Sequence, residues 1–96
     1  MFVLEVLSGP LDGKIWPFED EITIGRDDAA ACIALDRYIS RRHASIRARG
    51  DQLTLEDLES RNGTHVGADA RTVSETSLQL GERFMVGRTL LRVRPA

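Results

Sequence analysis

The feature that most constrains the fold is a series of short apolar runs separated by turn residues, as in residues 2–7, 22–24, 52–56 and 89–93. The eight glycines fall almost entirely between these runs, where tight turns or positive φ angles are needed. No stretch of a dozen residues carries the i, i+3, i+4, i+7 spacing of an amphipathic helix. The pattern predicts an all-β sandwich or barrel.

The expected strands are residues 2–7, 14–16, 22–24, 32–35, 43–47, 52–56, 64–66, 77–80, 83–86 and 89–93. Pro17 predicts that the second strand lies at a sheet edge or bends there. Gly50-Asp51 predicts a hairpin turn, and Cys32, inside an apolar run, is expected to be a core thiol. At 96 residues we expect one domain, 1–96, which is either the whole protein or the N-terminal module of a longer one.

The net charge of −2 gives no overall attraction for nucleic acid or for an anionic membrane. The distribution of charge is more informative, because all but one of the 13 basic residues are arginines. Five of them fall between positions 37 and 49, with no carboxylate among them. Two interpretations stay open: solvated arginines favoured by a GC-rich genome, or an anion site, since a guanidinium binds phosphate through two parallel hydrogen bonds.

Several classes of protein are not expected from this composition. A single cysteine forms no intrachain disulfide, and two histidines are too few for a zinc site, so we expect no metal and no cofactor. No signal peptide and no apolar stretch of membrane-spanning length is present, so we expect a cytoplasmic protein. The arginine-rich, lysine-poor composition suggests a bacterial origin.

Three polar segments interrupt the apolar runs: Gly25-Arg26, Ser40-Arg41-Arg42-His43 and Asn62-Gly63-Thr64. Each is a weak signal alone, and Asn-Gly is first of all a turn signal. In this order and spacing, however, they closely resemble the signature of the forkhead-associated (FHA) family. The resemblance extends over the chain and includes the opening Leu-Ser-Gly-Pro-x-x-Gly of residues 7–13.

This resemblance implies an eleven-stranded antiparallel or mixed β-sandwich with its recognition loops gathered at one end. It also implies a non-catalytic module that binds phosphothreonine in a partner protein, for signalling or assembly that depends on a Ser/Thr kinase. The partner would be a substrate of such a kinase or the kinase itself. Its identity and the oligomeric state of this chain stay open.

The resemblance assigns roles to individual residues. Arg26, Ser40 and Arg41 are expected to bind the phosphate, and Asn62 to bind the peptide main chain beside it. Specificity for neighbouring peptide residues is expected to involve Tyr38 and Arg61, and Arg61 stands where some members of the family carry a hydroxyl residue. Structural roles in the loops are implied for Gly25, His43, Gly63 and Thr64.

Three other interpretations compete with phosphothreonine binding. A phosphate-independent docking scaffold of the same fold, as in secretion machines, would typically lack the arginine and serine that stand here at Arg26 and Ser40. An enzyme would need Ser40 and His43 as nucleophile and base, but no Gly-x-Ser-x-Gly elbow surrounds them. A nucleic-acid-binding domain would need aromatic residues interleaved with the arginines, and these are missing.

Overall fold

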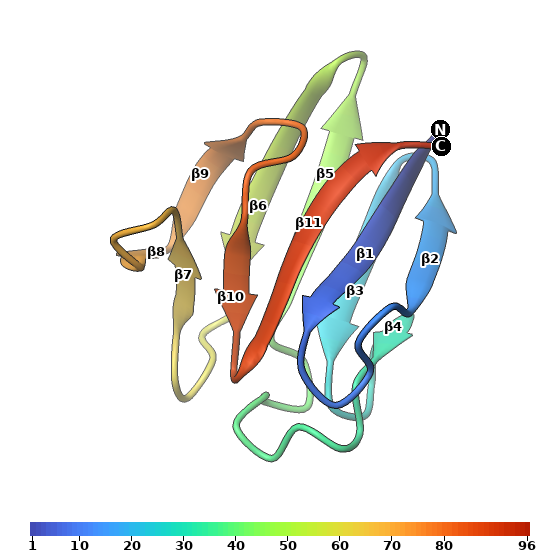
Figure 1. Ribbon diagram of the computed structural model, residues 1–96. Helices are drawn as coiled ribbons and strands as arrows, with labels where there is room; N and C mark the ends of the chain where they lie inside the picture. The colour runs from blue at the N-terminus through green and yellow to red at the C-terminus, as the bar shows by residue number, and fades with distance from the viewer.

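Two β-sheets and no helix make up the protein, which a computed structural model describes over all residues 1–96. The six-stranded sheet has the order β2-β1-β11-β10-β7-β8, and the five-stranded sheet the order β4-β3-β5-β6-β9. All strand pairs are antiparallel except β3 and β4, so the architecture is the expected eleven-stranded mixed sandwich (Figure 1). The strands are β1 (Phe2–Ser8), β2 (Ile15–Phe18), β3 (Glu21–Gly25), β4 (Ala31–Cys32), β5 (Ala44–Arg49), β6 (Gln52–Asp57), β7 (Thr64–Val66), β8 (Arg71–Val73), β9 (Glu75–Leu78), β10 (Phe84–Val86) and β11 (Thr89–Pro95).

The prediction from the apolar runs was right for most strands and wrong at two places. It missed β8, whose residues are exposed or only partly buried and therefore show no apolar alternation. The prediction also placed a strand over the whole apolar run of residues 32–35, whereas β4 ends at Cys32. The chain turns there because the Asp36 N–H donates to the Ile33 carbonyl, 3.2 Å away.

The structure also tests the predictions made for Pro17, Gly50 and Cys32. Pro17 lies in β2, which is an edge strand as predicted. The hairpin turn at Gly50 joins β5 to β6, with Gly50 at a φ of 62°. The prediction that Cys32 is a core thiol was wrong, because Cys32 is exposed. The reason is the alternation of side chains in a strand, which buries its neighbours Ala31 and Ile33 and turns Cys32 outward.

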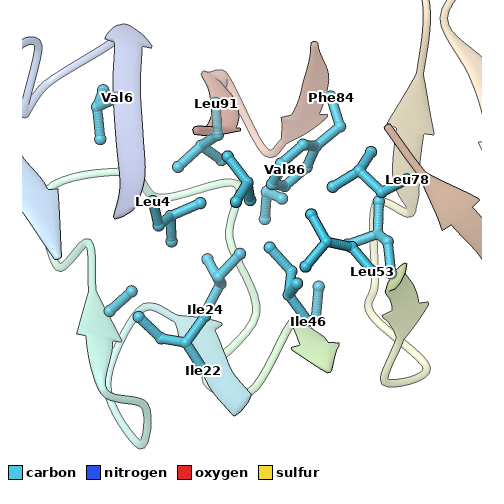
Figure 2. Close-up of a cluster of buried hydrophobic side chains, with 14 of the residues drawn as sticks. Leu4, Val6, Ile22, Ile24, Ile46, Leu53, Leu78, Phe84, Val86 and Leu91 are labelled. Carbon is cyan, nitrogen blue, oxygen red and sulfur yellow. The ribbon is translucent and has the colours of Figure 1, made fainter. Parts of the chain in front are cut away.

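The core lies between the sheets and consists of one cluster of 18 buried apolar residues. In β11 the buried positions alternate with half-buried ones, so that Leu91 and Val93 face the opposite sheet. Figure 2 shows side chains of the six-stranded sheet, such as Leu4 and Phe84, directed toward Ile24 and Ile46 of the other sheet. Burying each such side chain stabilises the fold by about 1.5–3 kcal/mol.

The long loops gather at one end of the sandwich, and both termini lie at the opposite end (Figure 1). The loops between β3 and β4, between β4 and β5, and between β6 and β7 all reach this end. It is therefore here that the three polar segments of the sequence meet. The structure contains no helix with the length and apolar character that spanning a bilayer requires.

Candidate phosphopeptide site

A shallow pocket of about 180 Å³ opens among these loops. It collects all four residues expected to contact a ligand and both residues expected to affect specificity. A larger hollow of the molecule lies elsewhere, on the outer face of the six-stranded sheet. The loop pocket is nevertheless where the cations and the hydrogen-bonding groups converge. It is lined by Arg26, Arg37, Tyr38, Ile39, Ser40, Arg41, Arg61 and Asn62.

Arg26 follows directly on the end of β3 and is fixed by its main chain rather than by its side chain. Its N–H donates to the Ser40 carbonyl at 3.0 Å, and its own carbonyl accepts from the Cys32 thiol at 3.3 Å. Gly25 permits this approach, because a Cβ there would stand 2.1 Å from the Arg41 carbonyl oxygen, far inside contact distance. The guanidinium is exposed and forms no ion pair, so it is available to an anion.

Ser40 is held on three sides. Its N–H donates to Nδ1 of His43, its carbonyl accepts from Arg26, and its Oγ accepts from the Arg61 N–H at 2.9 Å. The hydroxyl hydrogen remains free, since Oγ serves only as an acceptor in these contacts. Ser40 therefore presents a hydrogen-bond donor to the pocket beside the arginines.

Asn62 connects the β6–β7 loop to the β4–β5 loop. Its Nδ2 donates to the Tyr38 carbonyl at 2.8 Å, which fixes the side-chain amide. The Oδ1 and the second N–H of the amide remain free for a donor and an acceptor of a ligand main chain. Gly63 follows at a φ of 83°, which its lack of a Cβ permits and which turns the chain into β7.

His43 is fully buried and binds the two loops together. Its Nδ1 accepts from the Ser40 N–H at 3.0 Å, so Nε2 carries the hydrogen and donates to the Gly63 carbonyl at 2.9 Å. Burial lowers the pKa of His43, and the hydrogen bond to Gly63 opposes this only in part. The neutral imidazole is therefore the form that joins the loops.

Arg41 differs from Arg26 in having a partner. Its Nε lies 3.3 Å from Oδ2 of Asp27, and both side chains are mostly exposed, at 70% and 65%. Such exposed pairs contribute only about 0–1 kcal/mol. Arg41 is thus weakly held and would have to leave Asp27, or share it, to approach an anion in the pocket.

Comparison with known proteins shows which family the chain belongs to. Residues 5–96 match the family described as the inner membrane component of T3SS, cytoplasmic domain. A solved structure described as a structural and functional analysis of phosphothreonine-dependent FHA domain interactions is 33% identical, with a TM-score of 0.84 over 99% of this chain and 96% of that one. This chain belongs to the FHA family. FHA domains are protein-interaction modules.

Two further relatives support the assignment. The FHA domain of the CT664 protein from Chlamydia trachomatis has a TM-score of 0.88 at 27% identity, over 99% of this chain and 97% of that one. The FHA domain-containing protein FhaB of Mycobacterium tuberculosis is 34% identical over 93 residues, or 96% of this chain. That stretch is 59% of FhaB, so this FHA domain spans little more than half of its relative's length.

Two aspartates that the sequence analysis did not assign to the site organise the loops of this FHA domain. Asp36 is 2% exposed and accepts hydrogen bonds from the main-chain N–H groups of Tyr38 and Arg88 and from the hydroxyl of Thr89, at 2.7–3.0 Å. Its carboxylate joins the β4–β5 loop to the start of β11. No sequence pattern predicts the contacts with Arg88 and Thr89, because these partners lie more than fifty residues from Asp36 in the chain.

Asp57 organises the second loop. Its carboxylate accepts from the N–H and the hydroxyl of Ser60 and from the hydroxyl of buried Thr64. Partial burial raises the pKa of Asp57, but the hydrogen bonds from Ser60 and Thr64 outweigh it, so the pKa lies below its usual value. The available signal was the cluster of Asp57, Ser60 and Asn62 before Gly63, since these residue types favour turns.

Two more side chains at this end were not predicted. The guanidinium of Arg88 stacks on the ring of Tyr38, 4.2 Å from the ring centre. His65 donates from Nε2 to the Asn62 carbonyl at 3.2 Å and accepts at Nδ1 from Thr72. The first contact holds Tyr38 at the edge of the pocket, and the second braces the turn that carries Asn62.

Proposed function

We propose that this FHA domain binds phosphothreonine in a partner protein, as a non-catalytic module for kinase-dependent signalling or assembly. The observation that carries the proposal is the pocket in which a free guanidinium, Arg26, and a free hydroxyl hydrogen, Ser40, converge. Both groups donate, and both are fixed by main-chain contacts rather than by competing acids. A dianion with three acceptor oxygens is the ligand that such a pair favours.

Each residue has a defined contribution in this proposal. Arg26 and Ser40 donate charge-assisted hydrogen bonds to the phosphate, and Arg41 adds a second cation after releasing Asp27. Asn62 binds the peptide main chain through its free amide groups. Tyr38 and Arg61 line the pocket on either side and bias which residues flank the phosphothreonine.

The expected affinity is micromolar. Hydrogen bonds to charged groups contribute about 1.5–3 kcal/mol each, so three or four contribute about 6–10 kcal/mol before ordering and desolvation are subtracted. A dissociation constant near 1 μM corresponds to about −8 kcal/mol. The second pKa of the phosphate is about 6, so affinity should fall as the pH falls through that value.

The hydrogen bonds of His43 argue against esterase chemistry at Ser40. A general base would need a free ring nitrogen directed at the Ser40 hydroxyl. Nδ1 instead accepts from the Ser40 main-chain N–H, and Nε2 donates to Gly63. The ring therefore supports the loops, which is consistent with a binding module.

A phosphate-independent scaffold in a secretion machine is the alternative, and the matched T3SS family fits it without favouring it. The two functions differ in one measurable property, the dependence on phosphate. An oriented library of phosphothreonine peptides, screened beside its unphosphorylated copy, tests both phosphate dependence and flanking preference. We expect retention of phosphorylated peptides only, lost in Arg26→Ala and Ser40→Ala and kept in the control Arg49→Ala, which alters an exposed arginine at the opposite end of β5. Equal retention of both libraries would support the scaffold instead.

A further inference from the structure

The two outer faces of the sandwich differ in chemistry. On the five-stranded sheet, cross-strand neighbours that point away from the core are polar or charged, and Arg47 forms an ion pair with Glu56. Such a face is stable in water without a partner. Its two rows are Thr23, Ser45, Glu56 and Glu75, and Glu21, Arg47, Thr54 and Ser77.

The outer face of the six-stranded sheet carries an apolar groove. Leu90, Met85 and His65 are cross-strand neighbours on β11, β10 and β7, and each is only partly buried. With Ala68 and Ala70 of the β7–β8 turn they line an open hollow of about 460 Å³. This volume falls within the range of about 300–1,000 Å³ that is typical of ligand pockets.

The shape of this groove depends on a turn that is held in place. The Gly67 N–H donates to the Arg83 carbonyl, and the Ala70 N–H donates to the Gly67 carbonyl, each at 3.1 Å. Ala70 has a φ of 52°, a conformation that non-glycine residues adopt at a cost of order 1–3 kcal/mol. The wall of the groove is therefore fixed rather than collapsed onto Met85 and Leu90.

The groove and the candidate phosphopeptide site are neighbours, because a hydrogen bond joins a residue of one lining to a residue of the other. His65 lines the groove, and its Nε2 donates to the carbonyl of Asn62, whose side chain lines the phosphate pocket. Asn62 and His65 are also joined by the short turn that enters β7. The groove therefore lies within reach of a polypeptide that leaves the pocket past Asn62.

We propose that the groove is a second contact site for the same phosphorylated partner and takes apolar side chains that flank its phosphothreonine. The inference rests on the proposed function and extends it from a motif to a longer segment. The longest dimension of the domain is 32 Å. Because an extended chain spans about 3.3 Å per residue, the apolar residues should lie about four to ten residues from the phosphothreonine. Met85 suits this role, since its flexible side chain adapts to different apolar partners.

Synthetic peptides test the proposal. A phosphothreonine is placed in the centre of a polar peptide of about 25 residues, and a Leu-Phe pair is moved through successive positions on either side. A short phosphopeptide with about two residues on each side serves as the reference, because it ends before the proposed distance. Affinities are measured by titration calorimetry for the wild type, Ala68→Arg, Met85→Glu and the control Ser77→Arg on the polar outer face.

We expect an apolar pair within the proposed distance to raise affinity about tenfold over the short peptide, as for the burial of one apolar side chain. Ala68→Arg and Met85→Glu should remove this gain and leave short-peptide affinity unchanged, and Ser77→Arg should change neither. Ala68 lies exposed in a turn, so its substitution leaves the core intact.

Other results would overturn the proposal. These are an affinity that no position of the pair improves, a gain that survives Ala68→Arg, or a dimer in sedimentation velocity that Ala68→Arg dissociates, which would make a second copy the occupant. Failure of the proposed function is seen separately, because the short phosphopeptide would then bind no better than its unphosphorylated form.

Discussion

Two of the three loops that form the loop pocket are each built around an aspartate, but the carboxylates are held in different ways. In the β4–β5 loop, Asp36 is almost fully buried and accepts hydrogen bonds from its own loop and from Arg88 and Thr89 at the start of β11. In the β6–β7 loop, Asp57 is partly buried and accepts only from Ser60 and Thr64, within seven residues.

This difference between the two aspartates indicates that the β4–β5 loop positions the β6–β7 loop. Asp36 ties the first loop to the sandwich, whereas Asp57 shapes the second loop locally. The second loop then depends on the first through four hydrogen bonds, which join Leu58 and Gly63 to His43, Arg61 to Ser40, and Asn62 to Tyr38. We therefore expect damage at Asp36 to affect the whole domain and damage at Asp57 to affect mainly Asn62.

The largest effect is expected for Asp36→Asn. Three donors, of which the Thr89 hydroxyl is fully buried, would lose a charged acceptor. Hydrogen bonds to charged groups contribute about 1.5–3 kcal/mol each, and the amide oxygen would replace them in part. We expect a loss of about 2–4 kcal/mol in the free energy of unfolding, together with weaker phosphopeptide binding. Urea denaturation followed by fluorescence of Trp16 measures the first quantity.

A smaller effect is expected for Asp57→Asn. Thr64 is buried, but Ser60 lies in a partly exposed turn, where water replaces some of the lost bonds, so the loss should be about 1–2 kcal/mol. Phosphopeptide affinity should fall through displaced Asn62. A loss of stability equal to or larger than that of Asp36→Asn would contradict the proposed order of the two loops.

The contact between the loops should depend on pH through His43. The folded state holds this histidine neutral and lowers its pKa, while in the unfolded chain the pKa is about 6.5. As the pH falls through about 6.5, the unfolded state gains a proton that the folded state does not, so stability should decrease. Asp57, whose pKa is also lowered, should add a further decrease only as the pH falls below about 4.

The variant His43→Gln separates these two contributions. Glutamine keeps one donor and one acceptor for the loops but does not titrate. Urea denaturation at a series of pH values should show the decrease near neutral pH in the wild type and its absence in His43→Gln, while the decrease in acid remains in both. An unchanged pH profile in the variant would exclude His43 as the titrating group.

The smallest change in stability is expected for Arg41→Ala. Its exposed ion pair with Asp27 contributes about 0–1 kcal/mol. Stability should therefore be nearly unchanged, and phosphopeptide affinity should fall by less than in Arg26→Ala. Asp27→Ala, which releases the Arg41 side chain, is the matched control and should leave affinity equal or higher. An Arg41→Ala affinity below that of Arg26→Ala would reverse the assigned roles of the two arginines.

How much of this could be predicted from the sequence differs between the scaffold and the site. The alternating side chains of β1 and β11 are visible as a pattern because they reflect the core directly. The exposed edge strand β8 has no such pattern and was missed. Cys32 was misplaced because an apolar run does not show which of its residues face outward.

Of the residues that line the pocket, Arg26, Ser40, Arg41 and Asn62 belong to the three short motifs, and Tyr38 and Arg61 stand close to two of them in the sequence. Structural roles for Gly25, His43, Gly63 and Thr64 were implied by the resemblance, but their hydrogen-bond partners and the two aspartates Asp36 and Asp57 were not identified, because most of these contacts join residues that are distant in the chain. Asp36 reaches Arg88 across 52 positions, and His43 reaches Gly63 across 20. Such pairs leave no periodicity and no local motif in the sequence, so they are recognised only in the folded structure.

The most direct test of the central claim is titration calorimetry of one peptide in three forms, carrying threonine, phosphothreonine or phosphoserine at the same position. The peptide is the best sequence from the library screen, and wild type is compared with Arg26→Ala. The account predicts micromolar binding of the phosphothreonine form, no measurable binding of the threonine form, and a loss of about 2 kcal/mol in Arg26→Ala. Equal affinity for the threonine and phosphothreonine forms would contradict it.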